Sequence, residues 1–216
     1  MPTKTDERRR LRMDALMAHD AVYPAFGTSL AGMDEAGRGP LLGPVMASCV
    51  IMPRESALPW VDDSKKLSPA RREAVYAEIM ARALFVGVGE ASAAEIDRLN
   101  ILEATKLAMH RAAEAAPATL CLVDAVRGLD VPFATMPIIH GDAVSYCIAA
   151  ASIVAKVTRD RLIRQMAERY PAYGLERNMG YGTAEHIAAI LRCGPCAEHR
   201  RSFIGKWIAD TGEAKQ

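Results

Sequence analysis

Four acidic residues stand where apolar stretches of the sequence end. Asp34 and Glu35 end one such stretch, Asp124 ends a second, and Asp142 closely follows a third. A carboxylate at the end of an apolar strand is costly to bury unless something pairs with it. Four clustered carboxylates repel one another and would bind hard divalent cations such as Mg²⁺ or Mn²⁺ through their oxygens. The four residues are therefore candidate metal ligands.

Each of these acids has an alternative role as a cap of a helix or turn, since Asp is a common N-cap residue. This alternative is less favoured for Asp34, which closes an apolar strand. Adjacent strand residues point to opposite faces of a sheet, so Asp34 and Glu35 can share a site only if the strand ends or bulges between them. The Gly-Arg-Gly-Pro turn at 37–40 allows such a break.

The elements that must position these acids alternate between strands and helices. Apolar runs bounded by glycine and proline predict strands at 30–35, 45–52, 85–89, 120–123 and 135–139. Helical patterns predict helices at 3–21, 68–84, 92–99, 101–116, 142–168 and 183–192. A hairpin-like start followed by strand–helix alternation predicts an α/β domain with a mixed sheet, and the sequence from Tyr170 adds helices and loops without strands.

Length and charge limit the possible classes of protein. The 216 residues suit one domain, or one domain with a small appendage. Lys and Arg together number 27 against 26 Asp and Glu, so the net charge of +1 excludes a general polyanion binder and any nucleic-acid site must be a local patch. The polar helix at 3–21 is expected to be an exposed appendage.

The cysteine pattern and the absence of targeting signals predict a soluble, cytoplasmic protein. The five cysteines are an odd number and mostly occupy apolar stretches, as buried reduced thiols do. No apolar h-region follows the charged N-terminus, and no apolar run approaches the roughly 18 residues of a membrane span. We expect no membrane partner.

Short motifs follow one another in a fixed order over residues 30–207. They are 34–40 (DEAGRGP) with Gly43-Pro44, 63–68 (DSKKLS), 99–101 (LNI), 149–156 (AAASIVAK) with Arg159-Asp160, 180–183 (GYGT) with His186, and 199–203 (HRRSF). Together they resemble type 2 ribonucleases H, and ribonuclease HII in particular. The resemblance implies an RNase H-like mixed five-stranded sheet flanked by helices. It divides the chain into an N-terminal helical extension (1–25), a catalytic core (26–168) and a small C-terminal helical, substrate-binding portion with a tail (169–216).

The resemblance also implies an activity and its catalytic residues. Asp34, Glu35, Asp124 and Asp142 would hold two divalent ions, Mg²⁺ or Mn²⁺. The family hydrolyses the RNA strand of RNA–DNA hybrids and nicks duplex DNA 5′ to misincorporated ribonucleotides, leaving 3′-hydroxyl and 5′-phosphate ends. Two metal ions can activate a water and stabilise the leaving oxygen of such a displacement. Both kinds of duplex are thus the expected partners, and a one-chain enzyme is the expected state.

Substrate contacts follow from the same resemblance. Glycines allow the backbone to approach a sugar closely, and the 2′-hydroxyl is the group that distinguishes RNA from DNA. The residues implied in recognising it are Gly37, Arg38, Gly39 and Tyr181. Candidate phosphate contacts, whose alternative is solvated surface charge, are Ser64, Lys65 and Lys156.

The sequence departs from the family pattern at two positions. Ala125 follows Asp124 where the family usually has glycine. Because alanine is strained in a left-handed backbone, the local turn is expected to differ. Met179 precedes Gly180 where the family commonly has lysine, which removes one phosphate contact and suggests somewhat weaker backbone binding.

Two further motifs suggest other functions. The sequence Cys193-Gly194-Pro195-Cys196 is the thioredoxin tetrapeptide, but here it follows a predicted helix instead of opening one. With His199 it would offer three zinc ligands, one fewer than structural zinc requires. The basic run Arg8-Arg9-Arg10 with Arg12 predicts a solvated helix face, with a supplementary nucleic-acid contact as the alternative.

Overall fold

The computed structural model describes residues 3–62 and 64–208, with only the backbone of Lys65 described. Asp63 of the second motif and the side chain of Lys65 thus lie outside the described residues. The five strands are β1 (Leu30–Ala36), β2 (Val45–Ile51), β3 (Phe85–Ala91), β4 (Leu120–Asp124) and β5 (Ala134–Ile138). The α-helices are α1 (Lys4–Asp20), α2 (Pro69–Arg82), α3 (Ala93–Leu99), α4 (Ile101–Ala113), α5 (Tyr146–Arg169), α6 (Leu175–Asn178), α7 (Ala184–Cys193) and α8 (Arg201–Ile208). Three short 3₁₀ helices are η1 (Ser64–Lys66), η2 (Gly141–Ala143) and η3 (Pro171–Tyr173).

The strands form one mixed sheet in the order β3-β2-β1-β4-β5. β1, β2 and β3 pair antiparallel, whereas β1, β4 and β5 pair parallel. The predicted hairpin and mixed sheet are therefore confirmed. Because β1 and β4 are adjacent and parallel, their carboxyl ends meet at one edge of the sheet.

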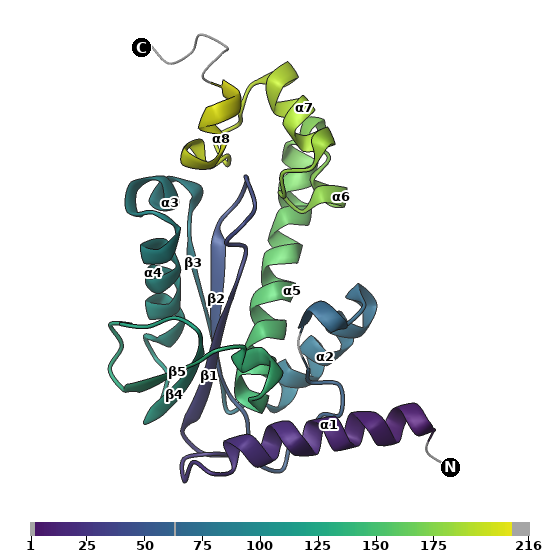
Figure 1. The fold of residues 1–216 in the computed structure, drawn as a ribbon, viewed down its shortest axis with the longest axis vertical. Helices are drawn as coiled ribbons and strands as arrows, with labels where there is room; N and C mark the ends of the chain where they lie inside the picture. The colour runs from purple at the N-terminus through teal and green to yellow at the C-terminus, as the bar shows by residue number, and fades with distance from the viewer. Residues whose placement is uncertain (1–2, 63, 209–216) are drawn as a thin grey trace.

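Helices cover both faces of the sheet (Figure 1). α3 and α4 lie on one face, and α1, α2 and α5 lie on the other. The C-terminal helices α6, α7 and α8 gather beyond the far end of α5 and share with it a third apolar cluster that includes Leu42, Ile163 and Ile190. Among the described residues no helix is long and apolar enough to cross a membrane.

α5 packs unusually close to the central strand β1. A Cβ at Gly32 would lie 2.0 Å from the backbone carbon of Cys147, so only glycine permits this contact. Cys147, Cys49 and Cys121 are buried free thiols, as their apolar surroundings predict. Burial raises the pKa of the Cys147 thiol, which keeps it protonated and unreactive.

The beginning of α5 differs from the prediction. The helix begins at Tyr146 and not at 142, because Ser145 is extended and caps it by accepting a hydrogen bond from the backbone N–H of Ile148. Asp142 lies in the separate helix η2. It is thus carried by a short turn and not by the first turn of the long helix.

α1 is not a fully exposed appendage. Met13 and Leu16 are buried in the core beside α5. The buried carboxylate of Asp20 accepts hydrogen bonds from the backbone N–H of Cys147 and the hydroxyl of Ser145, so it stabilises the N-terminus of α5. The expectation was wrong because the many charged residues of this helix conceal a narrow apolar stripe.

Candidate active site

Three aspartates converge at the carboxyl edge of the sheet. Asp34 comes from β1, Asp124 ends β4, and Asp142 lies in η2, which follows β5. One carboxylate oxygen of each lies within 4.8 Å of the other two. Within the described ranges no other three acidic, histidine or cysteine side chains come together in this way.

Hydrogen bonds fix two of these carboxylates. The backbone N–H of Gly141 donates to Asp124 Oδ1 at 2.8 Å, which ties the end of β4 to η2. The backbone N–H of Glu35 donates to Asp34 Oδ1 at 2.7 Å. The oxygens of the three aspartates are therefore held close together by backbone contacts as well as by the sheet.

The electrostatics of the site disfavour its ionised form when no cation is present. Burial raises the pKa of Asp34 well above its ordinary value, and the charges of Glu35 and Asp124 raise it further, although a hydrogen bond from Ser152 opposes them. A divalent cation would relieve this repulsion. A set of carboxylate oxygens matches the ligand preference of Mg²⁺ and Mn²⁺, so the residues fit such ions.

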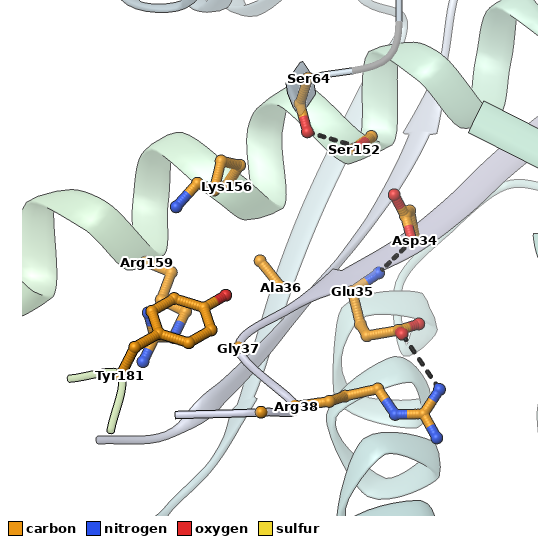
Figure 2. A pocket seen from close by; sticks show the side chains of 11 residues that line it. Asp34, Glu35, Ala36, Gly37, Arg38, Ser64, Ser152, Lys156, Arg159 and Tyr181 are labelled. Atoms are coloured by element: carbon orange, nitrogen blue, oxygen red, sulfur yellow. Dashed lines mark hydrogen bonds and ion pairs between the residues drawn. The ribbon is translucent and has the colours of Figure 1, made fainter. Parts of the chain in front are cut away.

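Glu35 lies outside the three-aspartate set. The pairing of β1 with β2 runs without a bulge through Asp34, Glu35 and Ala36, so neighbouring side chains alternate. Figure 2 shows the Asp34 carboxylate directed toward Ser152 and the Glu35 carboxylate directed toward Arg38, whose Nη1 lies 3.4 Å from Glu35 Oε1. Glu35 still lines the same pocket as Asp34.

A pocket of about 240 Å³ adjoins Asp34 (Figure 2). Six of the seven substrate-binding candidates line it, the exception being Lys65, whose side chain lies outside the described residues. Those six are Gly37, Arg38, Gly39, Ser64, Lys156 and Tyr181. Residues distant in the sequence thus surround one hollow beside the carboxylates.

Contacts within the pocket wall connect its parts. The hydroxyls of Ser64 and Ser152 lie 2.9 Å apart, joining η1 to α5. Lys156 Nζ pairs with Asp160 at 2.6 Å, which fixes the ammonium at the pocket. A Cβ at Gly39 would lie 3.7 Å from the Tyr181 ring, so the glycine loop and the half-exposed tyrosine face each other.

Two buried arginines for which the sequence predicted no role hold the glycine loop. Arg200 donates to the carbonyl oxygens of Gly37, Arg38 and Gly43 at 2.6, 3.0 and 2.8 Å. Arg159 donates to the carbonyl oxygens of Pro44, Met179 and Leu42 at 3.3, 3.1 and 3.2 Å. Both arginines belong to the motifs that carry the family resemblance, and this was the only sign of a role for them in the sequence. Nothing else in the sequence predicts their burial, because most arginines in proteins are exposed.

The two residues that depart from the family pattern, Ala125 and Met179, both adopt a left-handed backbone. Ala125 adopts a left-handed backbone with φ +54°, so the expectation of a different turn was wrong. Met179 is also left-handed, with φ +49°, and its carbonyl oxygen accepts a hydrogen bond from Arg159.

The tetrapeptide at 193–196 stands at the end of α7, whose last residue is Cys193, and does not open a helix. Gly194, with φ +72°, ends the helix. Cys193 is exposed and Cys196 is partly buried, and both are free thiols. The thioredoxin geometry, in which the motif opens a helix, is therefore not present.

Comparisons with known proteins agree with this geometry. The sequence model of the family Ribonuclease HII matches residues 31–206. Ribonuclease HII of Geobacillus thermodenitrificans (strain NG80-2) is 53% identical over 204 residues, 92% of this chain and 77% of that protein. Ribonuclease HII of Geobacter sulfurreducens is 51% identical over 179 residues, 82% of each chain.

Solved structures show the same fold. Ribonuclease H2 of Pyrococcus horikoshii OT3 superimposes with a TM-score of 0.72 at 24% identity, covering 85% of this chain and 99% of that one. Bst-RNase HIII in complex with Mn²⁺ superimposes with a TM-score of 0.68 at 19% identity, covering 93% and 74%. The architecture is therefore that of the ribonucleases H, as predicted. With the sequence matches, the chain belongs to the ribonuclease HII family and is a phosphodiester hydrolase of the ribonuclease H type.

Proposed function

We propose that this protein is an endoribonuclease that hydrolyses the RNA strand of RNA–DNA hybrids and nicks duplex DNA 5′ to misincorporated ribonucleotides, leaving 3′-hydroxyl and 5′-phosphate ends. The observation that carries the proposal is the convergence of Asp34, Asp124 and Asp142 beside the pocket of the glycine loop and Tyr181. The enzyme acts as a monomer in ribonucleotide excision repair. Its five free cysteines support action in the cytoplasm, a reducing compartment.

The three aspartates would hold two divalent ions, Mg²⁺ or Mn²⁺, with Glu35 completing the set from the adjacent position of β1. Bound there, the ions would supply activation of a water and stabilisation of the leaving oxygen in an in-line displacement. The protein contributes a prearranged group of carboxylates whose mutual repulsion a divalent cation would relieve. Since Asp34 and Asp124 are fixed by backbone N–H groups, little reorganisation is needed during the reaction.

The glycine loop is suited to recognise a sugar through its backbone. Arg200 engages the carbonyl oxygens of Gly37 and Arg38. Among the described residues no hydrogen bond uses the backbone N–H of Arg38 or Gly39. These donors therefore remain for a 2′-hydroxyl, which can accept as well as donate. The ring of Tyr181 faces the loop and can stack against the neighbouring sugar. Ser64, Lys65 and Lys156 would bind flanking phosphates and set the register of the strand.

The decisive experiment uses duplex DNA with one ribonucleotide, incubated with and without Mg²⁺, and maps the nick and its end groups. We expect a nick 5′ to the ribonucleotide that requires the divalent ion. Asp34→Asn and Asp124→Asn should abolish cleavage while the variants still bind the duplex. The exposed Glu114→Gln serves as a matched loss of one carboxylate and should cleave normally. Full Mg²⁺-dependent cleavage by either aspartate variant would refute the assigned roles.

A further inference from the structure

A second hollow, of about 530 Å³, lies between α1 and the segment around η1. Among the described residues of its wall, five are Lys or Arg and one is a carboxylate, so cationic side chains dominate. We call it the α1 cleft, and its lining residues are Lys4, Thr5, Arg8, Arg9, Arg12, Asp62, Lys66 and Leu67. The family match begins at residue 31, so α1 lies outside the matched region.

The α1 cleft is joined to the catalytic edge of the sheet by Arg12. Its Nη2 donates to the carbonyl oxygen of Ala143 at 2.6 Å, one residue beyond Asp142, and also lies 3.1 Å from Asp62 Oδ1. Figure 1 shows α1 crossing the end of the molecule at which α5 begins. η1 has Ser64 on the active-site pocket and Lys66 on the α1 cleft, so the two hollows are neighbours.

Arg9 of the cleft lies close to other cations, among them Arg71 of α2, which lies outside the cleft. The guanidinium carbons of Arg9 and Arg71 lie 3.3 and 3.9 Å from the centroid of the Trp60 ring. Arg9 Nε is buried and has no hydrogen-bond partner among the described residues. Burial lowers the pKa of Arg9, and the charges of Arg71 and Arg8 lower it further, although the carboxylates of Asp62 and Asp6 oppose them. An anion in the cleft would offset this repulsion between cations.

We propose that the α1 cleft binds the phosphate backbone of the nucleic-acid duplex beyond the cleavage site. This proposal rests on the proposed function, because it extends the track of the same substrate. Guanidinium groups pair with phosphate in a bidentate manner, and such contacts set register without reading sequence. The net charge of +1 gives the chain little overall attraction for a polyanion. Attraction must therefore come from a local cluster of cations such as this one.

The test compares two double variants of the full chain. In Lys4→Gln/Arg8→Gln, both residues are exposed, line the cleft and form no ion pair among the described residues. The control, Arg10→Gln/Arg82→Gln, removes the same charge from exposed positions outside the cleft, one of them on α1 itself. Binding is measured over a salt series with an all-DNA duplex, which needs no cleavage. KM and kcat are measured on the same duplex with one ribonucleotide.

Each lost phosphate contact makes the negative slope of log affinity against log salt shallower by about 0.9. The cleft variant loses one or two such contacts, so its slope should be shallower than that of wild type by about 0.9 to 1.8. At ~0.1 M salt its affinity should fall roughly 8- to 60-fold, with KM raised and kcat unchanged. Unaltered slope and KM in the cleft variant, or equal losses in the control, would overturn the proposal. A wild type that binds duplex with the expected salt slope yet does not cleave would instead refute the proposed function alone.

Discussion

The Nε2 atoms of His186 and His199 lie 3.2 Å apart, in a chain of hydrogen bonds that ends on the backbone of Tyr181. The backbone N–H of Cys196 donates to His199 Nδ1 at 3.0 Å, so a neutral His199 carries its proton on Nε2 and donates it to His186. His186 then donates from Nδ1 to the carbonyl oxygen of Tyr181 at 2.9 Å. The proton position on His199 thus fixes the proton position on His186. This series of hydrogen bonds forms only when both imidazoles are neutral.

This histidine pair should make stability depend on pH. Burial, followed by the charge of His186, lowers the pKa of His199 to about 4, and burial lowers that of His186. The unfolded chain is therefore protonated first as pH falls. The stabilisation from neutral His199 is complete above about pH 6.5 and is lost as pH falls through about 4.

The measurement is the free energy of unfolding from pH 4 to 6.5 for wild type and His199→Gln, whose amide can replace both hydrogen bonds. The wild-type slope should exceed that of the variant by up to about 1.4 kcal/mol per pH unit. The other titrating groups are common to both proteins, so their contributions cancel in the difference between the two slopes. Identical slopes for wild type and His199→Gln would contradict the argument.

Tyr181→Ala should slow cleavage at a lone ribonucleotide in DNA by about tenfold to a hundredfold, because the variant removes the ring that we propose stacks on the sugar. Tyr181 is 46% exposed, so truncation costs little folding energy. Tyr181→Phe keeps the ring and separates stacking from the role of the hydroxyl. Rates are compared by single-turnover kinetics with excess enzyme. An unchanged rate for Tyr181→Ala would remove this residue from the recognition site.

Asp34→Asn should inactivate the enzyme without destabilising it. Burial and the charges of Glu35 and Asp124 raise the pKa of Asp34, so its contribution to stability is present below its unfolded pKa and is lost as pH rises through the folded pKa. Above its unfolded pKa the Asp34 carboxyl therefore costs stability. Asparagine removes this cost and keeps an oxygen that accepts from the N–H of Glu35.

Thermal denaturation with and without Mg²⁺ checks this expectation. Without the ion, Asp34→Asn should melt at or above the temperature of wild type. Wild type should gain stability from Mg²⁺ by linkage to binding, and the variant should gain less. A variant that melts lower without Mg²⁺, yet gains as much from the ion as wild type, would show that Asp34 is structural.

Much of this site could be predicted from the sequence because its signals are local. An apolar run that ends in an acid, as at Asp34 and Asp124, marks both a strand and the edge where parallel strands meet. The alternation of side chains also identified the difficulty with Glu35. Its pairing with β2 is unbroken, and its carboxylate is not among the three that lie within 4.8 Å of one another, although its charge still raises the pKa of Asp34.

The rest depended on contacts between distant parts of the chain. Arg200 reaches carbonyl oxygens more than 150 residues away, and no local pattern distinguishes it from the exposed Arg201. Asp20 likewise stands at the end of a highly charged helix, although its buried carboxylate accepts a hydrogen bond from the backbone N–H of Cys147 at the start of α5. Such roles follow from tertiary packing and leave no periodic signal in the sequence.

Arg200→Lys should therefore weaken both stability and activity. A lysine ammonium is a point charge that cannot span three carbonyl oxygens held by the guanidinium fork. Burial lowers the pKa of Arg200 to about 9, which leaves it charged at neutral pH. We expect a loss of roughly 2–4 kcal/mol in unfolding free energy and a raised KM at temperatures where the variant is folded.

The neighbouring exposed Arg201→Lys is the matched control and should behave as wild type. Chemical denaturation gives the stability, and steady-state kinetics on a single-ribonucleotide duplex gives KM. If Arg200→Lys lowered stability but left KM unchanged, the arginine would hold the fold without positioning the glycine loop.

Ala125→Gly should stabilise the protein. The left-handed backbone of Ala125, with φ +54°, costs an L-residue about 1–2 kcal/mol, whereas glycine adopts it freely. The greater entropy of glycine in the unfolded chain reduces this stabilisation by about 0.5–1 kcal/mol. Because the Ala125 side chain is exposed, its removal loses no buried surface. The net gain should be about 0.5–1 kcal/mol by chemical denaturation, with cleavage unchanged because Asp124 keeps its bond from Gly141. Ala115→Gly, exposed and without positive φ, should lose a similar amount. A destabilised Ala125→Gly would mean that the turn after Asp124 is not strained by its side chain.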